Sequence, residues 1–225
     1  MTPAAITPHD HSQRAREICL MAPVIPVLVI ETLAHAVPLA RALVAGGLPA
    51  LEVTLRTPAA LDAIRAMAEV PGGVVGAGTL LTPADVRAAR AAGAQFGVSP
   101  GATERLIAAC DEEGLPLLPG AATATEVMAL LERGFTVQKF FPAEASGGAA
   151  ALKAIGAPIP QVCFCPTGGI SLGNAADYLA LANVLCVGGS WVAPKAAMEA
   201  GDWARVEALA REAAALAREA AALPR

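Results

Sequence analysis

One pattern repeats eight times along the chain and limits the folds that it can adopt. Each repeat is a short apolar run, then a turn rich in Gly, Pro and Thr, then an alanine-rich amphipathic stretch. Strands that alternate with helices in this way are typical of a parallel sheet covered by helices. The expected strands are 24–30, 50–55, 74–78, 95–99, 116–119, 136–141, 162–166 and 184–188.

The spacing of the strand ends favours a closed barrel. Successive ends are separated by as few as 19 residues, from Pro100 to Pro119, and by as many as 28, from Lys139 to Thr167. Each interval holds a strand, a helix and two short loops, so we expect an α/β fold of the (β/α)8, or TIM-barrel, type. An open doubly wound sheet is the alternative, although no G-x-G-x-x-G follows the first strand. Helices are expected near 34–46, 58–69, 82–92, 102–113, 123–133, 148–155, 171–182 and 202–222.

Two kinds of signal mark where helices begin. Thr57-Pro58 and Thr82-Pro83 place a capping residue before a proline at the first helical position. Thr82 with Asp85 resembles a capping box, and a second such box begins at Thr123.

Length, charge and cysteine content limit the class of protein. The 225 residues suit one domain, 1–225, with an N-terminal helix and an alanine-rich C-terminal helix. A net charge of −4 offers no basic surface to nucleic acid or an anionic membrane. Pro23 and Pro26 interrupt the longest apolar run, so no membrane span is expected. The N-terminus has no basic region followed by a long apolar stretch, so no secretory signal is expected. Cys163 and Cys165 are interpreted as buried free thiols, which indicates a cytoplasmic location.

Lys139 is the first candidate catalytic residue. It is one of three lysines in the chain, and it lies at the expected end of an apolar strand. Alternation places Val137, Lys139 and Phe141 on one face. If that face points into the barrel, burial disfavours the ammonium and yields a nucleophilic amine. A lysine that reaches the rim, or that pairs with a carboxylate, is the structural alternative.

Glu52 is the second candidate. Alternation separates Leu51 and Val53 from Glu52, Thr54 and Arg56, so the polar face is expected to line the barrel. A carboxylate there is costly unless it is paired or functional. Such a carboxylate suits a general base beside an imine on Lys139, whereas a structural ion pair with Arg56 or Lys139 is the alternative.

Glycine-rich turns follow the last two expected strands. Glycine lets backbone N–H groups approach an anion, and the loops after strands seven and eight often bind phosphate in barrels. A phosphate-binding site is therefore predicted at Gly168, Gly169, Gly189 and Ser190. No metal and no cofactor are expected. His9 and His11 lie in an N-terminus expected to be mobile, and His35 opens a helix, which argues against a zinc-dependent enzyme.

Six motifs occur in register between about residues 20 and 205. They are Glu52-Val-Thr-Leu-Arg-Thr57, Gly76-Ala-Gly-Thr79, Ser99-Pro-Gly101, Lys139-Phe-Phe-Pro-Ala-Glu144, Cys165-Pro-Thr-Gly-Gly-Ile170 and Gly188-Gly-Ser-Trp191. In this combination they resemble the 2-keto-3-deoxy-6-phosphogluconate (KDPG) aldolase family, which overlaps with 4-hydroxy-2-oxoglutarate (KHG) aldolase. The resemblance implies a class I aldolase in which Lys139 forms a Schiff base and Glu52 is the acid/base group.

The resemblance also implies a substrate site and a reaction. Arg56 and Thr79 would hold the pyruvyl carboxylate with Thr167 close by, and Pro100 and Phe141 would form apolar walls. The phosphate would lie on the glycine turns. KDPG would be cleaved to pyruvate and glyceraldehyde 3-phosphate, and KHG to pyruvate and glyoxylate, by a cytoplasmic homotrimer.

Two other classes remain open on the residues alone. A phosphate-binding barrel isomerase or synthase without covalent catalysis explains the glycine turns but not the apolar setting of Lys139. A non-catalytic sugar-phosphate-binding barrel needs no pairing of Glu52 with Lys139.

Overall fold

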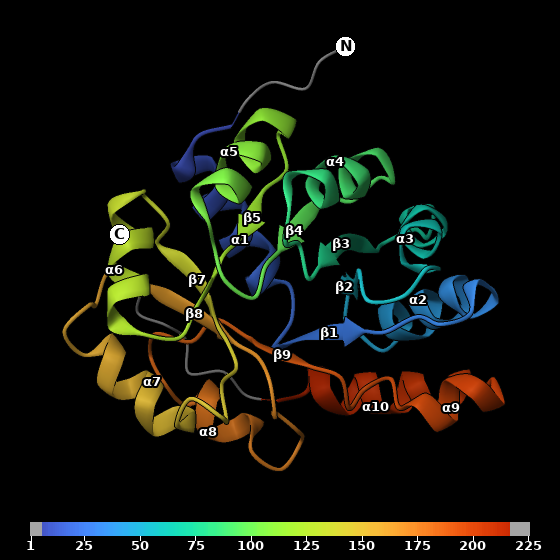
Figure 1. The fold of residues 1–225 in the computed structure, drawn as a ribbon. Coiled ribbons are helices and arrows are strands. Elements are labelled where there is room, and N and C mark those ends of the chain that lie inside the picture. The colour runs from blue at the N-terminus through green and yellow to red at the C-terminus, as the bar shows by residue number, and fades with distance from the viewer. Residues whose placement is uncertain (1–5, 217–225) are drawn as a thin grey trace.

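The computed structural model describes residues 6–216, in which parallel strands alternate with helices (Figure 1). The strands are β1 (Val24–Leu28), β2 (Ala50–Thr54), β3 (Val74–Gly78), β4 (Phe96–Val98), β5 (Leu117–Leu118), β6 (Gly120–Ala121), β7 (Val137–Phe140), β8 (Cys163–Pro166) and β9 (Val187–Gly189). The helices are α1 (Pro8–Leu20), the 3-10 helix η1 (Leu33–His35), α2 (Ala36–Ala45), α3 (Ala60–Ala68), α4 (Pro83–Ala91), α5 (Glu104–Glu113), α6 (Ala124–Glu132), α7 (Gly148–Gly156), α8 (Ala175–Leu179), α9 (Lys195–Ala200) and α10 (Trp203–Ala214).

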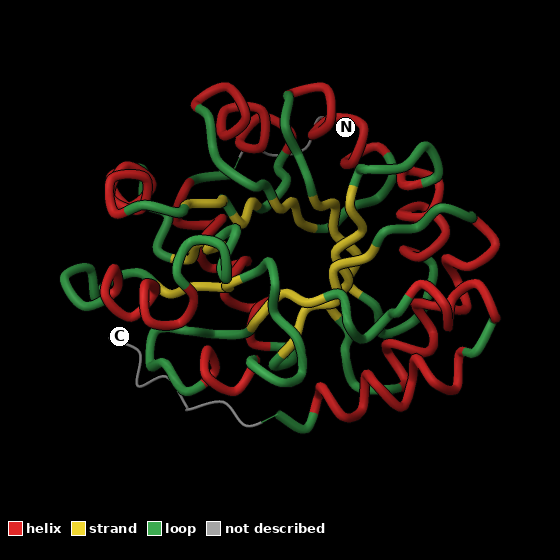
Figure 2. Tube along the Cα trace, turned by 60° about the horizontal axis from the view of Figure 1, so that its bottom comes forward, coloured by secondary structure: helices red, strands yellow, loops and turns green. Residues whose placement is uncertain are grey.

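The strands form two parallel sheets. One sheet has the order β5-β4-β3-β2-β1-β9, and the other has the order β6-β7-β8. Pro119 alone separates β5 from β6, and a bridge between Thr167 and Gly188 links the β8 loop to β9. Figure 2 shows the strands around the middle of the molecule with the helices outside them. All eight expected strand positions therefore carry strand, and the fifth is divided at Pro119, which has no N–H to donate.

Strand alternation divides the interior into two apolar clusters. Leu51, Val53 and Phe140 pack toward the surrounding helices. The opposite strand faces form a second group, here called the inner cluster, together with residues of α1. Its members are Ala15, Ile18, Cys19, Ile25, Ala50, Phe96, Val98, Leu118, Val137, Cys163, Cys165, Leu185 and Cys186. Helix α1 packs against β5 and β7, so it covers one end of the strands.

The N-terminal segment is more ordered than the sequence suggested. The predicted N-terminal helix is confirmed as α1, but the expectation of a mobile terminus is wrong for His11, whose side chain is fully buried. Nε2 of His11 donates to Oδ1 of Asp111 at 2.7 Å, and its Nδ1 accepts from the N–H of Leu117 at 2.8 Å. These contacts fix α1 to the start of β5.

Helix boundaries confirm two predictions and correct others. The capping boxes at Thr82 and Thr123 are present. Helix α3 begins at Ala60 instead of Pro58, because the hydroxyl of Thr57 donates to the carbonyl of Ile30 and does not cap the helix.

The C-terminal third differs from the prediction in length. Helix α8 covers only 175–179 of the expected 171–182, and α9 was not predicted. The tail helix begins at Trp203 and ends at Ala214, and the last part of the expected 202–222 lies outside the described residues. None of the helices within residues 6–216 combines the length and apolar character needed to cross a membrane.

Candidate active site

Lys139 lies on the inner face of β7. The strand runs between β6 and β8, where Lys139 is in register with Gly120 and Cys165. Val137 belongs to the inner cluster and Phe140 packs outward, so alternation directs Lys139 inward as predicted. Only 5% of Lys139 is exposed. The amine is therefore held in a largely dry interior instead of reaching solvent.

Glu52 meets Lys139 from the opposite part of the chain. Glu52 lies on β2 between Val27 of β1 and Gly76 of β3, and 3% of it is exposed. Nζ of Lys139 lies 3.4 Å from Oε1 of Glu52. The expected placement of both side chains inside the strands is confirmed, and they lie close enough to exchange a proton directly or through one water.

The local electrostatics favour a proton-transfer role for Glu52. Burial raises the pKa of the Glu52 carboxyl above its usual value, and the positive charge of Lys139 opposes that rise. A carboxyl group whose pKa is raised is better able to hold and release a proton near neutral pH. The same contact is also a buried ion pair, so geometry alone fits both interpretations of Glu52 made from the sequence.

A glycine next to Glu52 makes room for its carboxylate. A Cβ atom on Gly78 would lie 2.2 Å from Oε1 of Glu52, so any other residue at position 78 would displace the carboxylate. Gly78 ends β3, and the next residue, Thr79, has φ of 63°, the only positive φ of a non-glycine residue within residues 6–216. This conformation is strained for a β-branched residue. Strain of this kind at a strand end is common at functional sites.

Arg56 and Thr79 form a second pair above the strand ends. Nε of Arg56 donates to the hydroxyl of Thr79 at 3.3 Å. Arg56 is exposed and Thr79 is half-buried. The structure thus brings together the two residues expected to hold a carboxylate, with one guanidinium and one hydroxyl as donors.

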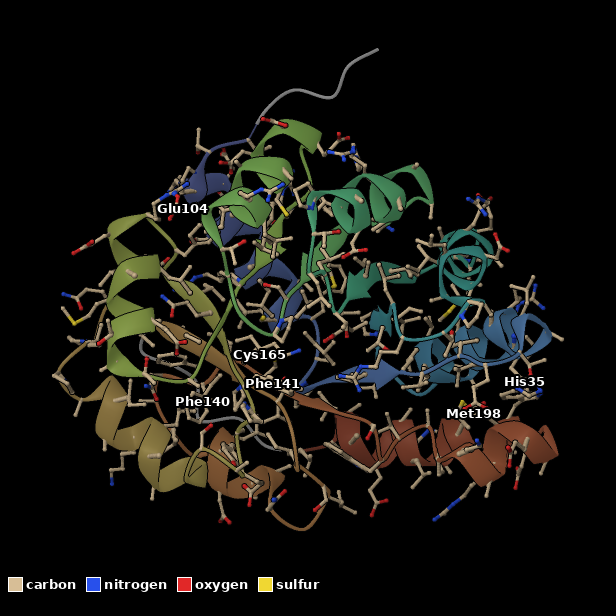
Figure 3. The ribbon with its side chains drawn as sticks, viewed as in Figure 1. His35, Glu104, Phe140, Phe141, Cys165 and Met198 are labelled. Atoms are coloured by element: carbon tan, nitrogen blue, oxygen red, sulfur yellow. The ribbon has the colours of Figure 1, made fainter. Side chains whose placement is uncertain are left out.

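Phe141, one of the two expected apolar walls, lies near the amine, and Pro100 lies beside the neighbouring strand β6. Nζ of Lys139 lies 5.1 Å from the centre of the Phe141 ring. Gly120 is the register partner of Lys139 on β6. The backbone carbonyl oxygen of Pro100 lies so close to Gly120 that a Cβ atom built on Gly120 would be 2.3 Å from that oxygen. In Figure 3, Phe141 and Cys165 lie near the middle of the molecule, whereas His35 and Met198 lie at its edge.

The glycine turns lie beside each other, as expected for one site. Gly168 and Gly169 have φ of 104° and 77°, which only glycine adopts readily. Thr167 is buried, and a Cβ on Gly188 would lie 2.2 Å from its hydroxyl. Ser190 is exposed at the end of β9.

A pocket of about 430 Å³ opens next to Ser190. The loops that follow β1 and β9 form its walls, with Glu31, Trp191 and Lys195 among the lining residues. The buried Lys139–Glu52 pair is not part of this lining. The pair brings an amine and a carboxylate together, which is the arrangement that a covalent reaction with proton transfer needs.

Three features near the site were not predicted from the sequence. The hydroxyl of Ser99 is buried without a hydrogen-bond partner in the described structure. The hydroxyl of Tyr178 donates to the carboxylate of Glu144 in the loop after β7. The thiols of Cys19, Cys165 and Cys186 lie together. The Tyr178–Glu144 contact and the group of three thiols have no local sequence signal, because they join residues that are distant in the chain.

The fold and the site together define an α/β enzyme of the carbon–carbon lyase class. The chain belongs to the family described as KDPG and KHG aldolase, whose model matches residues 15–209. The KHG/KDPG aldolase of Escherichia coli K12 is 56% identical over 200 residues, which are 88% of this chain and 94% of the relative.

Solved structures agree with this assignment. The KDPG aldolase of Zymomonas mobilis ZM4, solved with 3-phosphoglycerate, has a TM-score of 0.89 at 51% identity and covers 94% of this chain and 100% of its own. The KDPG aldolase of Legionella pneumophila was solved with pyruvate captured at low pH as a covalent carbinolamine intermediate. Its TM-score is 0.87 at 46% identity, with 89% of this chain and 98% of its own covered.

Proposed function

We propose that this chain cleaves KDPG to pyruvate and glyceraldehyde 3-phosphate through a Schiff base on Lys139. The observation that carries the proposal is the buried contact between Nζ of Lys139 and Oε1 of Glu52, at 3.4 Å. The covalent carbinolamine of pyruvate in the Legionella relative supports a covalent route in this family.

The reaction uses the pair in two stages. The neutral amine of Lys139 attacks the C2 ketone, and loss of water from the carbinolamine gives a protonated imine. Glu52 then accepts the proton of the C4 hydroxyl, directly or through a water, and the C3–C4 bond breaks. Its electron pair moves into the imine to give an enamine, while the aldehyde leaves. Protonation of the enamine at C3 and hydrolysis release pyruvate and restore the lysine.

The remaining residues bind the two ends of the substrate. Arg56 and Thr79 hold the carboxylate of the pyruvyl half, with Thr167 beside it, because charge-assisted hydrogen bonds suit a carboxylate. Pro100 and Phe141 exclude water from the imine. At the other end, a phosphate binds the backbone of the two glycine turns and the Ser190 hydroxyl. These four residues are Gly168, Gly169, Gly189 and Ser190.

KHG is the second substrate that we propose, with pyruvate and glyoxylate as products. The E. coli relative is named for both activities, and the pyruvyl half of the two substrates is the same. This substrate has no phosphate, so it would use Arg56, Thr79 and the catalytic pair without the glycine turns.

We further propose that the two sheets close into one eight-stranded barrel that forms a single domain. The junction at Pro119 and the bridge between Thr167 and Gly188 support this closure.

We also propose that the chain forms a homotrimer in the cytoplasm. A homotrimer would cover exposed apolar side chains such as Leu33 and Leu81, which are 46% and 58% exposed. All five cysteines are free thiols, which supports the reducing cytoplasm as the location.

Pyruvate release from each substrate tests the proposal. The purified chain should produce pyruvate and glyceraldehyde 3-phosphate from KDPG, and pyruvate and glyoxylate from KHG. Ser190→Ala should raise KM for KDPG by about two- to tenfold, the value of one lost hydrogen bond, and leave KM for KHG unchanged. Equal effects on both substrates would contradict the phosphate role of Ser190, and no pyruvate from either would contradict the function.

A further inference from the structure

Three cysteine thiols from distant parts of the chain meet in the inner cluster. Cys19 comes from α1, Cys165 from β8 and Cys186 from the segment that leads into β9. Their sulfur atoms all lie within 4.8 Å of one another. The three residues are 0–2% exposed. The remaining thiols, Cys110 and Cys163, do not belong to this group, although Cys163 lies on the same strand and face as Cys165.

We propose that Cys19, Cys165 and Cys186 form a binding site for a divalent thiophilic cation of the zinc and cadmium type. Thiolates select soft metals, and three protein ligands suffice for a zinc site that keeps one position open. A zinc–sulfur bond of about 2.3 Å places three ligand sulfurs about 4 Å apart. The thiols therefore need to move by less than about 1 Å to reach this geometry from their separation of up to 4.8 Å.

The charge of the surroundings favours a divalent ion. Binding follows M²⁺ + 3 Cys–SH → M(S–Cys)3⁻ + 3 H⁺, so the filled site carries one net negative charge. Lys139 is in register with Cys165 on the neighbouring strand and on the same inner face. Its ammonium would offset that charge, whereas a monovalent ion would leave two negative charges in a buried, largely apolar cluster. The site is separate from the carboxylate and phosphate positions proposed above, and its three sulfur ligands take no part in the proposed aldolase mechanism.

Access to the site depends on α1. The helix covers the strand ends and contributes Cys19, so an ion must enter while α1 moves away from β5 and β7. Uptake by the folded protein is therefore expected to be slow, and loading should be followed over hours.

Cadmium titration of the folded, reduced chain tests the site directly. One Cd²⁺ per chain should bind and produce the ultraviolet sulfur-to-cadmium charge-transfer band. Cys19→Ala and Cys186→Ala should each weaken binding at least tenfold and reduce the band. Cys163→Ala and Cys110→Ala, which remove buried thiols outside the group, should leave both unchanged. A band that is equal in all four variants, or no band in the folded wild-type chain, would overturn the proposal.

X-ray absorption on the cadmium-loaded wild-type chain gives an answer that needs no variant. Three sulfur neighbours around the ion are expected. Nitrogen or oxygen neighbours in their place would show that the ion binds elsewhere and would reject the site, even if a cysteine variant failed to fold.

Discussion

Nζ of Lys139 and Oε1 of Glu52 lie 3.4 Å apart on β7 and β2, and no more than 6% of either side chain is exposed. A buried ion pair contributes little to stability by itself, because desolvation offsets the attraction between its charges. A reaction that needs an amine and a proton acceptor in one dry place explains the pair better.

Glu52→Gln should separate proton transfer from imine formation. Glutamine keeps the size of the side chain and its contact with Lys139, but it cannot accept the C4 hydroxyl proton. We expect kcat for KDPG cleavage to fall by about 10²- to 10⁴-fold, while Lys139 still forms a reducible adduct with pyruvate. Steady-state kinetics and hydride trapping measure the two effects. Normal kcat would assign Glu52 a structural role.

Gly78→Ala should impair catalysis through the position of Glu52. The added Cβ would lie 2.2 Å from Oε1 of Glu52, so the carboxylate must leave its present position beside Lys139. Gly73→Ala is the matched control before the start of β3, where the nearest atom would lie 3.4 Å away in ordinary contact. We expect at least a tenfold loss of kcat for Gly78→Ala only, in variants whose circular dichroism is unchanged. Equal activity of the two variants would contradict this reading of Gly78.

Arg56→Ala should weaken substrate binding more than it slows the chemistry. Arg56 is exposed and hydrogen-bonds to Thr79, away from the buried proton-transfer pair. Loss of a charge-assisted contact to a carboxylate costs about 1.5–3 kcal/mol, so KM should rise by about 10- to 100-fold. Because both substrates have the pyruvyl half, KM for KHG should rise as well. An unchanged KM would show that Arg56 does not bind the substrate carboxylate.

Acid should destabilise the fold through His11. Burial lowers the pKa of His11 below its usual 6.5, although Asp111 opposes this shift. As pH falls through 6.5, the unfolded chain therefore binds more protons than the folded chain. The free energy of unfolding has its highest value above that pH and decreases below it. Urea unfolding at several pH values measures the decline. His11→Asn, which can still accept from the N–H of Leu117, should show a weaker decline between pH 7 and the folded pKa, and an identical pH dependence would exclude His11 as its cause.

Local patterns predicted the inner faces of the strands but not the contacts between distant segments. Alternation in 51–56 placed Glu52 correctly, because side-chain direction in a strand depends only on neighbouring residues. Thr57 resembled a helix cap, yet its hydroxyl bonds to Ile30. The burial of His11 depends on Asp111, 100 residues away. No local spacing could reveal such a partner.

The most direct test of the central claim is the intact mass of the folded chain after treatment with pyruvate and borohydride, followed by peptide mapping. We predict one reduced pyruvyl adduct per chain, located on Lys139. The adduct should be absent in Lys139→Ala and present in Lys153→Ala, in which an exposed helical lysine is replaced. No adduct in the folded wild-type chain, or an adduct on another lysine, would contradict the assignment of Lys139 as the Schiff-base residue.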